Sequence, residues 1–201
     1  ATMLAQLNEK RRIGYHTPVR HLIPEYRIKS PFKNSSPTTL IQLASHTSGL
    51  PRDAPINFWS NYTTGLWLLN GGRGKIKWYV TKGNLLKSLA GIELESLPNH
   101  ESHYSNLGFQ VLGVAMERQN GQTIPAYINQ NIFRPLGMQD TYFYLPREKY
   151  GRLAAVYSKD AQGKLVELGD GPFKRWGDYC TFSTNFPVSE PRTYFSGGSG
   201  L

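Results

Sequence analysis

The sequence predicts an α+β chain that is mostly helical and carries a few short antiparallel strands. Apolar residues recur at helical spacing over residues 107–121 and again over 123–137. Weak alternation over 153–157 and 165–168, with turn residues between them, predicts a hairpin. With 201 residues, 39% of them hydrophobic and 18% charged, the chain can bury one substantial core, so we expect residues 1–201 to form a single domain or most of one.

The first part of the chain predicts a helix, a long loop and a second, short helix. Residues 1–12 are expected to be helical, with Lys and Arg near the C-terminal end, where the helix dipole favours cations, and with Gly14 ending the helix. Four prolines interrupt any periodicity over 15–37, which predicts a loop. Threonine at 38 or 39 is expected to cap the short helix over 40–44.

The second half predicts three further helices and a strand. A helix over 84–90 stops at Gly91, and Gly121 is expected to end the helix that begins near residue 106. Thr123 caps the next helix, which Pro135 and Gly137 close. Residues 141–144 are expected to form a short strand.

The stretch over 98–113 carries the most informative polar residues, Tyr104, Ser105 and Asn106, directly before an apolar helix. Either Ser105 or Asn106 can cap its first turn. A tyrosine held there could shuttle a proton, and an asparagine could orient a substrate carbonyl without carrying charge. The tripeptide alone favours the other interpretation, a capping loop with a half-buried tyrosine.

Five segments of the chain, taken in order, resemble segments of a known protein family. Residues 43–51, 98–113 and 133–141 follow one another at a spacing that resembles the serine β-lactamase-like family, which includes class C β-lactamases, penicillin-binding proteins and esterase relatives. The resemblance continues through residues 1–7 and ends in 196–201, so it covers nearly the whole chain.

The resemblance implies a β-lactamase/transpeptidase-like fold, with a helical region beside an antiparallel sheet. It implies a hydrolase that cleaves an ester or amide, such as a β-lactam, a D-amino-acid peptide or a small ester, through a seryl acyl-enzyme. By the same resemblance Tyr104 and Asn106 are catalytic, and Ser105 contacts substrate or shapes the turn. A periplasmic or secreted location is also implied, and no cofactor is expected.

Of the three family motifs only Tyr-x-Asn is matched. Relatives carry Ser-x-x-Lys before the segment that resembles 1–7, and a Lys-Thr-Gly or His-x-Gly strand after the segment that resembles 196–201. We therefore expect residues 1–201 to be the middle of a domain, inactive and unstable by themselves. The alternative is a non-catalytic binding or scaffold protein of the same family.

Two other serines invite a nucleophile assignment. Ser30 and Lys33 match Ser-x-x-Lys, but no apolar helix follows them, so we treat the match as coincidence. His46 and Ser48 lie close in sequence, and we expect the histidine to satisfy backbone groups.

No metal site is expected. His100, Glu101 and His103 resemble a zinc-protease motif, but the histidines are three residues apart in a proline-containing loop. Cys180 is the single cysteine, which excludes an internal disulfide and a cysteine-rich metal site. The glycine-rich run at 71–75 fits neither a phosphate loop nor a dinucleotide fingerprint.

The net charge of +9 is unevenly spread, with seven Lys or Arg against two acids over 1–33 and five against none over 71–90. No nucleic-acid motif accompanies these cations, so we expect no nucleic-acid partner, while attraction to anionic surfaces stays open. The expected partner is a small-molecule or peptide substrate. Aromatic residues over 51–80 either wall its cleft or pack beneath a long loop.

Overall fold

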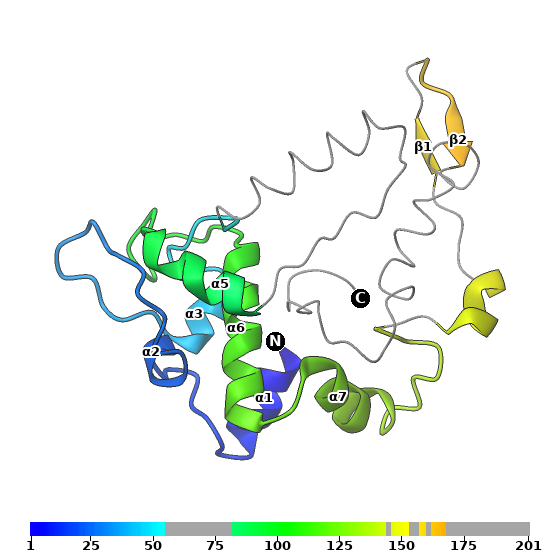
Figure 1. The fold of residues 1–201 in the computed structure, drawn as a ribbon, viewed down its shortest axis with the longest axis horizontal. Helices are drawn as coiled ribbons and strands as arrows, with labels where there is room; N and C mark the ends of the chain where they lie inside the picture. Colours follow the sequence, from blue (N-terminus) through cyan, green and yellow to red (C-terminus); the bar gives the residue numbers. More distant parts are fainter. Residues whose placement is uncertain (55–81, 144–145, 153–156, 160–161, 168–201) are drawn as a thin grey trace. The chain divides into compact units, whose positions relative to one another are not determined.

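The computed structural model describes residues 1–54, 82–143, 146–152, 157–159 and 162–167 (Figure 1). These residues fall into two compact units, and each is described by itself. The first unit holds the described residues up to Gln139, and the second begins at Asp140. The aromatic stretch and the glycine-rich run lie mostly in 55–81, and Cys180 lies in 168–201, so these predictions concern residues outside the described ones.

The first unit is helical, and its elements follow the order that the sequence predicts, with one exception. A short helix over Val19–Leu22 lies in the stretch 15–37 that was predicted to be a loop, so that prediction is wrong for these residues. Pro18 is the N-cap residue of this helix and Pro24 follows its end, so the prolines flank the helix and do not interrupt it. The helices of the first unit are α1 (Thr2–Glu9), α2 (Val19–Leu22), α3 (Leu40–Ala44), α5 (Lys82–Ser88), α6 (Asn106–Asn120) and α7 (Ile124–Ile128). A 3₁₀ turn, Leu89–Gly91, extends α5, and a π-helical turn, Asn129–Phe133, extends α7. Among the described residues no helix is long and apolar enough to cross a membrane.

Helix α6 is the centre of the first unit (Figure 1). It packs against α2, α3 and α7, and it buries Leu107, Val111 and Val114 almost completely. Leucines of α1, α3 and α5 complete the same core: Leu4, Leu7, Leu40, Leu43 and Leu85. Each such side chain contributes about 1.5–3 kcal/mol by leaving water, so α6 is held mainly by its apolar face.

The ends of α6 are those predicted from the sequence. Ser105 is the N-cap residue, and Gly121, in the left-handed conformation at φ 70°, ends the helix by donating its N–H to the Glu117 carbonyl (2.8 Å). The Glu117 side chain is buried, accepts from the Ile124 N–H (2.8 Å) and contacts the Lys82 ammonium. Glu117 thereby ties the first turns of α5 and α7 to α6.

The first helix ends earlier than predicted. It stops at Glu9 because Arg11, not Gly14, takes the left-handed conformation, at φ 54°. The N–H groups of Arg11 and Arg12 then donate to the carbonyls of Asn8 and Leu7, both at 2.9 Å. This is the hydrogen-bond pattern of a Schellman motif with arginine in the position usually held by glycine.

The second unit contains the predicted hairpin but not the predicted strand before it. Strand β1 (Tyr157–Lys159) pairs antiparallel with β2 (Leu165–Glu167), and a 3₁₀ turn spans Arg147–Arg152. Residues 141–143 are not extended into a strand, so that prediction is wrong for them. An antiparallel sheet beyond this hairpin stays a prediction.

Candidate active site

The candidate site lies where the loop after α3 meets residues 95–107, the loop before α6 and the start of that helix. Main-chain hydrogen bonds join the two segments along their length: Glu95 N–H to Gly49 O (2.8 Å), Asn99 N–H to Thr47 O (2.8 Å), His103 N–H to His46 O (2.9 Å) and Leu107 N–H to Arg52 O (3.1 Å). Gly49 permits this approach, because a Cβ there would lie 2.1 Å from the Ser96 carbonyl oxygen. The positions of residues 46–53 and 104–106 are therefore coupled.

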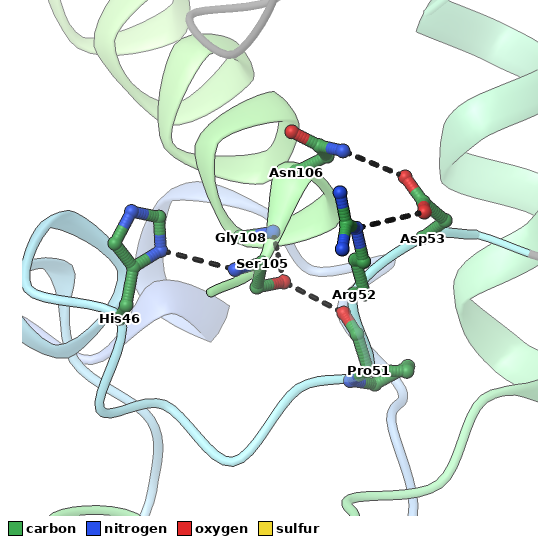
Figure 2. A network of polar contacts seen from close by, with 7 residues as sticks. All are labelled: His46, Pro51, Arg52, Asp53, Ser105, Asn106 and Gly108. Atoms are coloured by element: carbon green, nitrogen blue, oxygen red, sulfur yellow. Dashed lines mark hydrogen bonds and ion pairs between the residues drawn. The ribbon is translucent and has the colours of Figure 1, made fainter. Parts of the chain in front are cut away.

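Ser105 fixes the start of α6 (Figure 2). Its hydroxyl accepts from the Gly108 N–H (2.8 Å) and donates to the Pro51 carbonyl (2.7 Å), and the residue is 1% exposed. Its own N–H donates to Nδ1 of His46 (3.1 Å). That Ser105 contacts substrate stays a prediction; in the structure its hydroxyl is engaged with two backbone groups.

Asn106 is the first residue of α6, and its amide is oriented by Asp53 (Figure 2). Its Nδ2 donates to Oδ1 of Asp53 at 2.9 Å. A carboxylate only accepts hydrogen bonds, so the nitrogen of the amide must face Asp53. Among the described residues, neither the second Nδ2 hydrogen nor the amide oxygen makes a further hydrogen bond.

Tyr104 immediately precedes the cap and is 56% exposed. Its ring lies 4.6 Å from the His46 ring, centre to centre, and 5.8 Å from the Arg52 guanidinium carbon. Arg52 is itself held weakly by Asp53, at 3.8 Å between Nε and Oδ2. The phenol is thus supported from inside the protein while much of its surface faces solvent.

His46 contacts both Tyr104 and the start of α6. It adopts φ 61°, and the centre of its ring lies 4.6 Å from that of Tyr104 and 4.9 Å from that of Phe109. Partial burial lowers the pKa of His46 below its ordinary value of 6.5, which favours the neutral ring that can accept from Ser105 N–H. The prediction that His46 satisfies a backbone group is confirmed by this hydrogen bond.

The serine alternatives do not occupy catalytic surroundings in the part of the chain that is described. Ser30 and Lys33 are exposed in a loop, and Ser30 Oγ accepts from the Phe32 N–H (3.3 Å). Ser48 is 1% exposed, and its Oγ accepts from the Leu50 N–H (3.4 Å). Ser-x-x-Lys requires a helical turn between the two residues, but Ser30 and Lys33 do not lie in a helix, and the residue three positions after Ser48 is a proline.

The histidines of the 98–103 loop pair with a carboxylate. Glu101 contacts His103 Nε2 at 2.5 Å and His100 Nδ1 at 3.5 Å, and the hydrogen bond from His103 is the main cause of the lowered pKa of Glu101. All three side chains are exposed. Within the described ranges, no group of three or more His, Cys, Asp or Glu side chains is arranged to hold a metal.

Two residues of the site, Arg52 and Asp53, were not predicted from the sequence. They directly follow the 43–51 segment, but nothing local indicates that Asp53 reaches Asn106, 53 positions later. A charged residue a few positions after a left-handed glycine does not by itself predict a functional site. The role of Asp53 becomes visible only once the Gly49 turn is seen to pack against α6.

The helical unit with Tyr-x-Asn at the head of its buried helix matches solved structures of the β-lactamase/transpeptidase-like fold. The structure of a β-lactamase/D-alanine carboxypeptidase from Yersinia pestis, complexed with citrate, matches with a TM-score of 0.57 and 26% identity, over 76% of this chain and 40% of that one. The predicted fold is therefore confirmed at this level.

The sequence comparisons then give the family. The family model described as Beta-lactamase matches residues 1–200, so the chain belongs to the β-lactamase family. It is 29% identical to the D-alanyl-D-alanine-carboxypeptidase/endopeptidase AmpH of Escherichia coli K12, over 84% of this chain and 41% of AmpH. It is 28% identical to the esterase EstB of Burkholderia gladioli, over all of this chain and 50% of EstB. The chain thus spans half or less of the length of these two relatives, both of which bear the names of hydrolases.

Proposed function

We propose that the protein hydrolyses an ester or amide through a seryl acyl-enzyme, and that residues 1–201 supply its Tyr-x-Asn component. The observation that carries the proposal is the pairing of an exposed Tyr104 with an Asn106 whose amide is oriented by Asp53, both at the fixed start of α6. Membership of a family whose relatives include a peptidase and an esterase supports hydrolysis as the reaction class.

Tyr104 is the proposed proton relay. Serine Oγ attacks the acyl carbon, and its proton passes through the Tyr104 hydroxyl to the leaving alcohol or amine as the ester or amide bond breaks. Water then attacks the acyl-enzyme, and a proton returns to the serine as the acid departs. The Arg52 guanidinium carbon lies 5.8 Å from the centre of the Tyr104 ring, so Arg52 places a positive charge over this ring.

Asn106 is the proposed substrate-orienting residue. The Nδ2 hydrogen that does not point to Asp53 can donate to a carbonyl on the acyl side of the substrate. Because Asp53 fixes which end of the amide faces it, the donor is oriented before substrate binds. This geometry suits D-amino-acid peptides, β-lactams and small esters alike.

We place the proposed nucleophile outside residues 1–201, because Ser30 and Lys33 form the only Ser-x-x-Lys match in the sequence and neither residue lies in a helix. Intact mass after incubation with a fluorophosphonate, and separately with a penicillin, tests this. The whole protein should gain one fluorophosphonate adduct, and a chain of residues 1–201 should gain none. A labelled 201-residue chain would return Ser30 and Ser48 to consideration, and an unlabelled whole protein would exclude a seryl acyl-enzyme.

A further inference from the structure

His46 contacts residues 103–105 through its backbone carbonyl, its Nδ1 atom and its ring. Its Nδ1 accepts from the Ser105 N–H (3.1 Å), its carbonyl accepts from the His103 N–H (2.9 Å), and its ring lies 4.6 Å from the Tyr104 ring. One residue therefore holds the backbone on both sides of Tyr104 as well as the aromatic ring between them.

The contact with Ser105 depends on the protonation state of His46. Nδ1 can accept a hydrogen bond only while it carries no proton, so the imidazolium would present a donor to the Ser105 N–H. Among the described residues, the segments in contact with His46 also carry Arg52, whose guanidinium carbon lies 5.8 Å from the centre of the Tyr104 ring, Asp53, and Glu101, which pairs with His100 and His103.

We propose that His46 is a positioning residue for Tyr104, whose neutral imidazole holds the 103–105 backbone and the phenol ring in the geometry needed for proton relay. Protonation of His46 breaks the hydrogen bond to Ser105 and releases Tyr104 from that geometry. The acid limit of activity is therefore set by His46, a residue that touches no reacting atom. This inference rests on the proposed role of Tyr104.

The chain offers a well-matched substitution for this test. In His46→Asn the amide Oδ1 replaces Nδ1 at the same distance from the backbone, so the acceptor is kept but cannot be protonated. Asparagine also tolerates the positive φ of this position better than most residues. His46→Leu removes the acceptor, and His21→Asn, on the exposed side of α2, controls for loss of a histidine elsewhere.

The direct readout is the Ser105 amide in the whole protein, observed by ¹⁵N NMR with serine labelling and assigned by comparison with Ser105→Thr. In the parent protein its chemical shift should change with pH, with a midpoint below the ordinary histidine value of 6.5. The change should persist in His21→Asn and vanish in His46→Asn. A Ser105 amide chemical shift that stays constant from about pH 4.5 to 7.5 would overturn the proposal.

The kinetic readout separates positioning from general stability. We expect His46→Leu to lower kcat about tenfold or more at every pH. His46→Asn keeps the acceptor but loses the ring contact with Tyr104, so it should lose less activity than His46→Leu and hold its remaining activity to lower pH than the parent protein does. In a Tyr104→Phe background, His46→Leu should lower kcat little further, because the Tyr104 hydroxyl that His46 is proposed to position is already absent. Additive losses, or an unchanged acid limit in His46→Asn, would show that His46 does not act through Tyr104.

The two proposals fail in different ways. If Tyr104→Phe keeps full turnover, the proposed function is wrong, whatever the Ser105 amide does. If Tyr104→Phe loses turnover while both His46 variants behave as the parent protein, the proposed function stands and only the role of His46 is wrong.

Discussion

The substitution Ser105→Ala should destabilise the fold measurably, because the hydroxyl satisfies two backbone groups in a dry environment. It accepts from the Gly108 N–H (2.8 Å) and donates to the Pro51 carbonyl (2.7 Å), with the residue 1% exposed. Loss of an N-cap side chain costs about 1 kcal/mol. The Pro51 carbonyl is only partly buried, and its loss of a donor adds about 1 kcal/mol, so the expected loss is about 2 kcal/mol.

Urea unfolding of the whole protein, followed by far-UV circular dichroism, measures this loss. The control is Thr123→Ala, which removes the N-cap of α7, where the residue is exposed and its hydroxyl accepts from the Ala126 N–H at 3.4 Å. That longer, solvated bond should be worth about 0.5 kcal/mol or less. If Ser105→Ala costs no more than Thr123→Ala, the argument from burial and the Pro51 contact is refuted.

Two further substitutions test the fold around the site. Gly49→Ala should cost at least about 2 kcal/mol more than Gly121→Ala: both glycines have positive φ (75° and 70°), but only at Gly49 would a Cβ meet backbone, 2.1 Å from the Ser96 oxygen. Equal urea midpoints for the two variants would contradict this. Arg118→Gln should lower stability by up to about 1 kcal/mol at neutral pH, since the pair that Arg118 forms with Glu25 is solvated. The hydrogen bonds from Arg118 lower the pKa of Glu25 from 4.5 to about 2, so the stabilisation is complete above pH 4.5 and is lost as pH falls toward 2. A difference between parent and variant that stays constant from pH 6 to pH 3 would argue against it.

The parts of the fold that were predicted correctly are those with local signals. Helix α6 begins at a serine cap and ends at a left-handed glycine, and both signals lie within a few residues of the helix end that they mark. The end of α1 was predicted too late, because the left-handed residue there is Arg11, a type that rarely adopts positive φ. Residues 141–143 have strand-like composition, but strand formation depends on partners that local sequence does not specify.

The candidate site also combines local and non-local features. Tyr104, Ser105 and Asn106 are adjacent in sequence, so their common location followed from the helix start. The contacts that orient them do not: His46 reaches Ser105 across 59 positions and Asp53 reaches Asn106 across 53. These depend on how the Gly49 turn packs against α6, which a single sequence does not reveal.

The central claim is that the Tyr104 hydroxyl takes part in the chemistry and not in folding. Tyr104 is 56% exposed, and among the described residues its hydroxyl makes no hydrogen bond, so its removal should leave the melting temperature unchanged. The most direct measurement is kcat for hydrolysis of a small ester by the whole protein and by Tyr104→Phe, with Tyr15→Phe as a hydroxyl deletion away from the site. We predict a loss of at least about tenfold in Tyr104→Phe and none in Tyr15→Phe. Unchanged turnover in Tyr104→Phe would contradict the account.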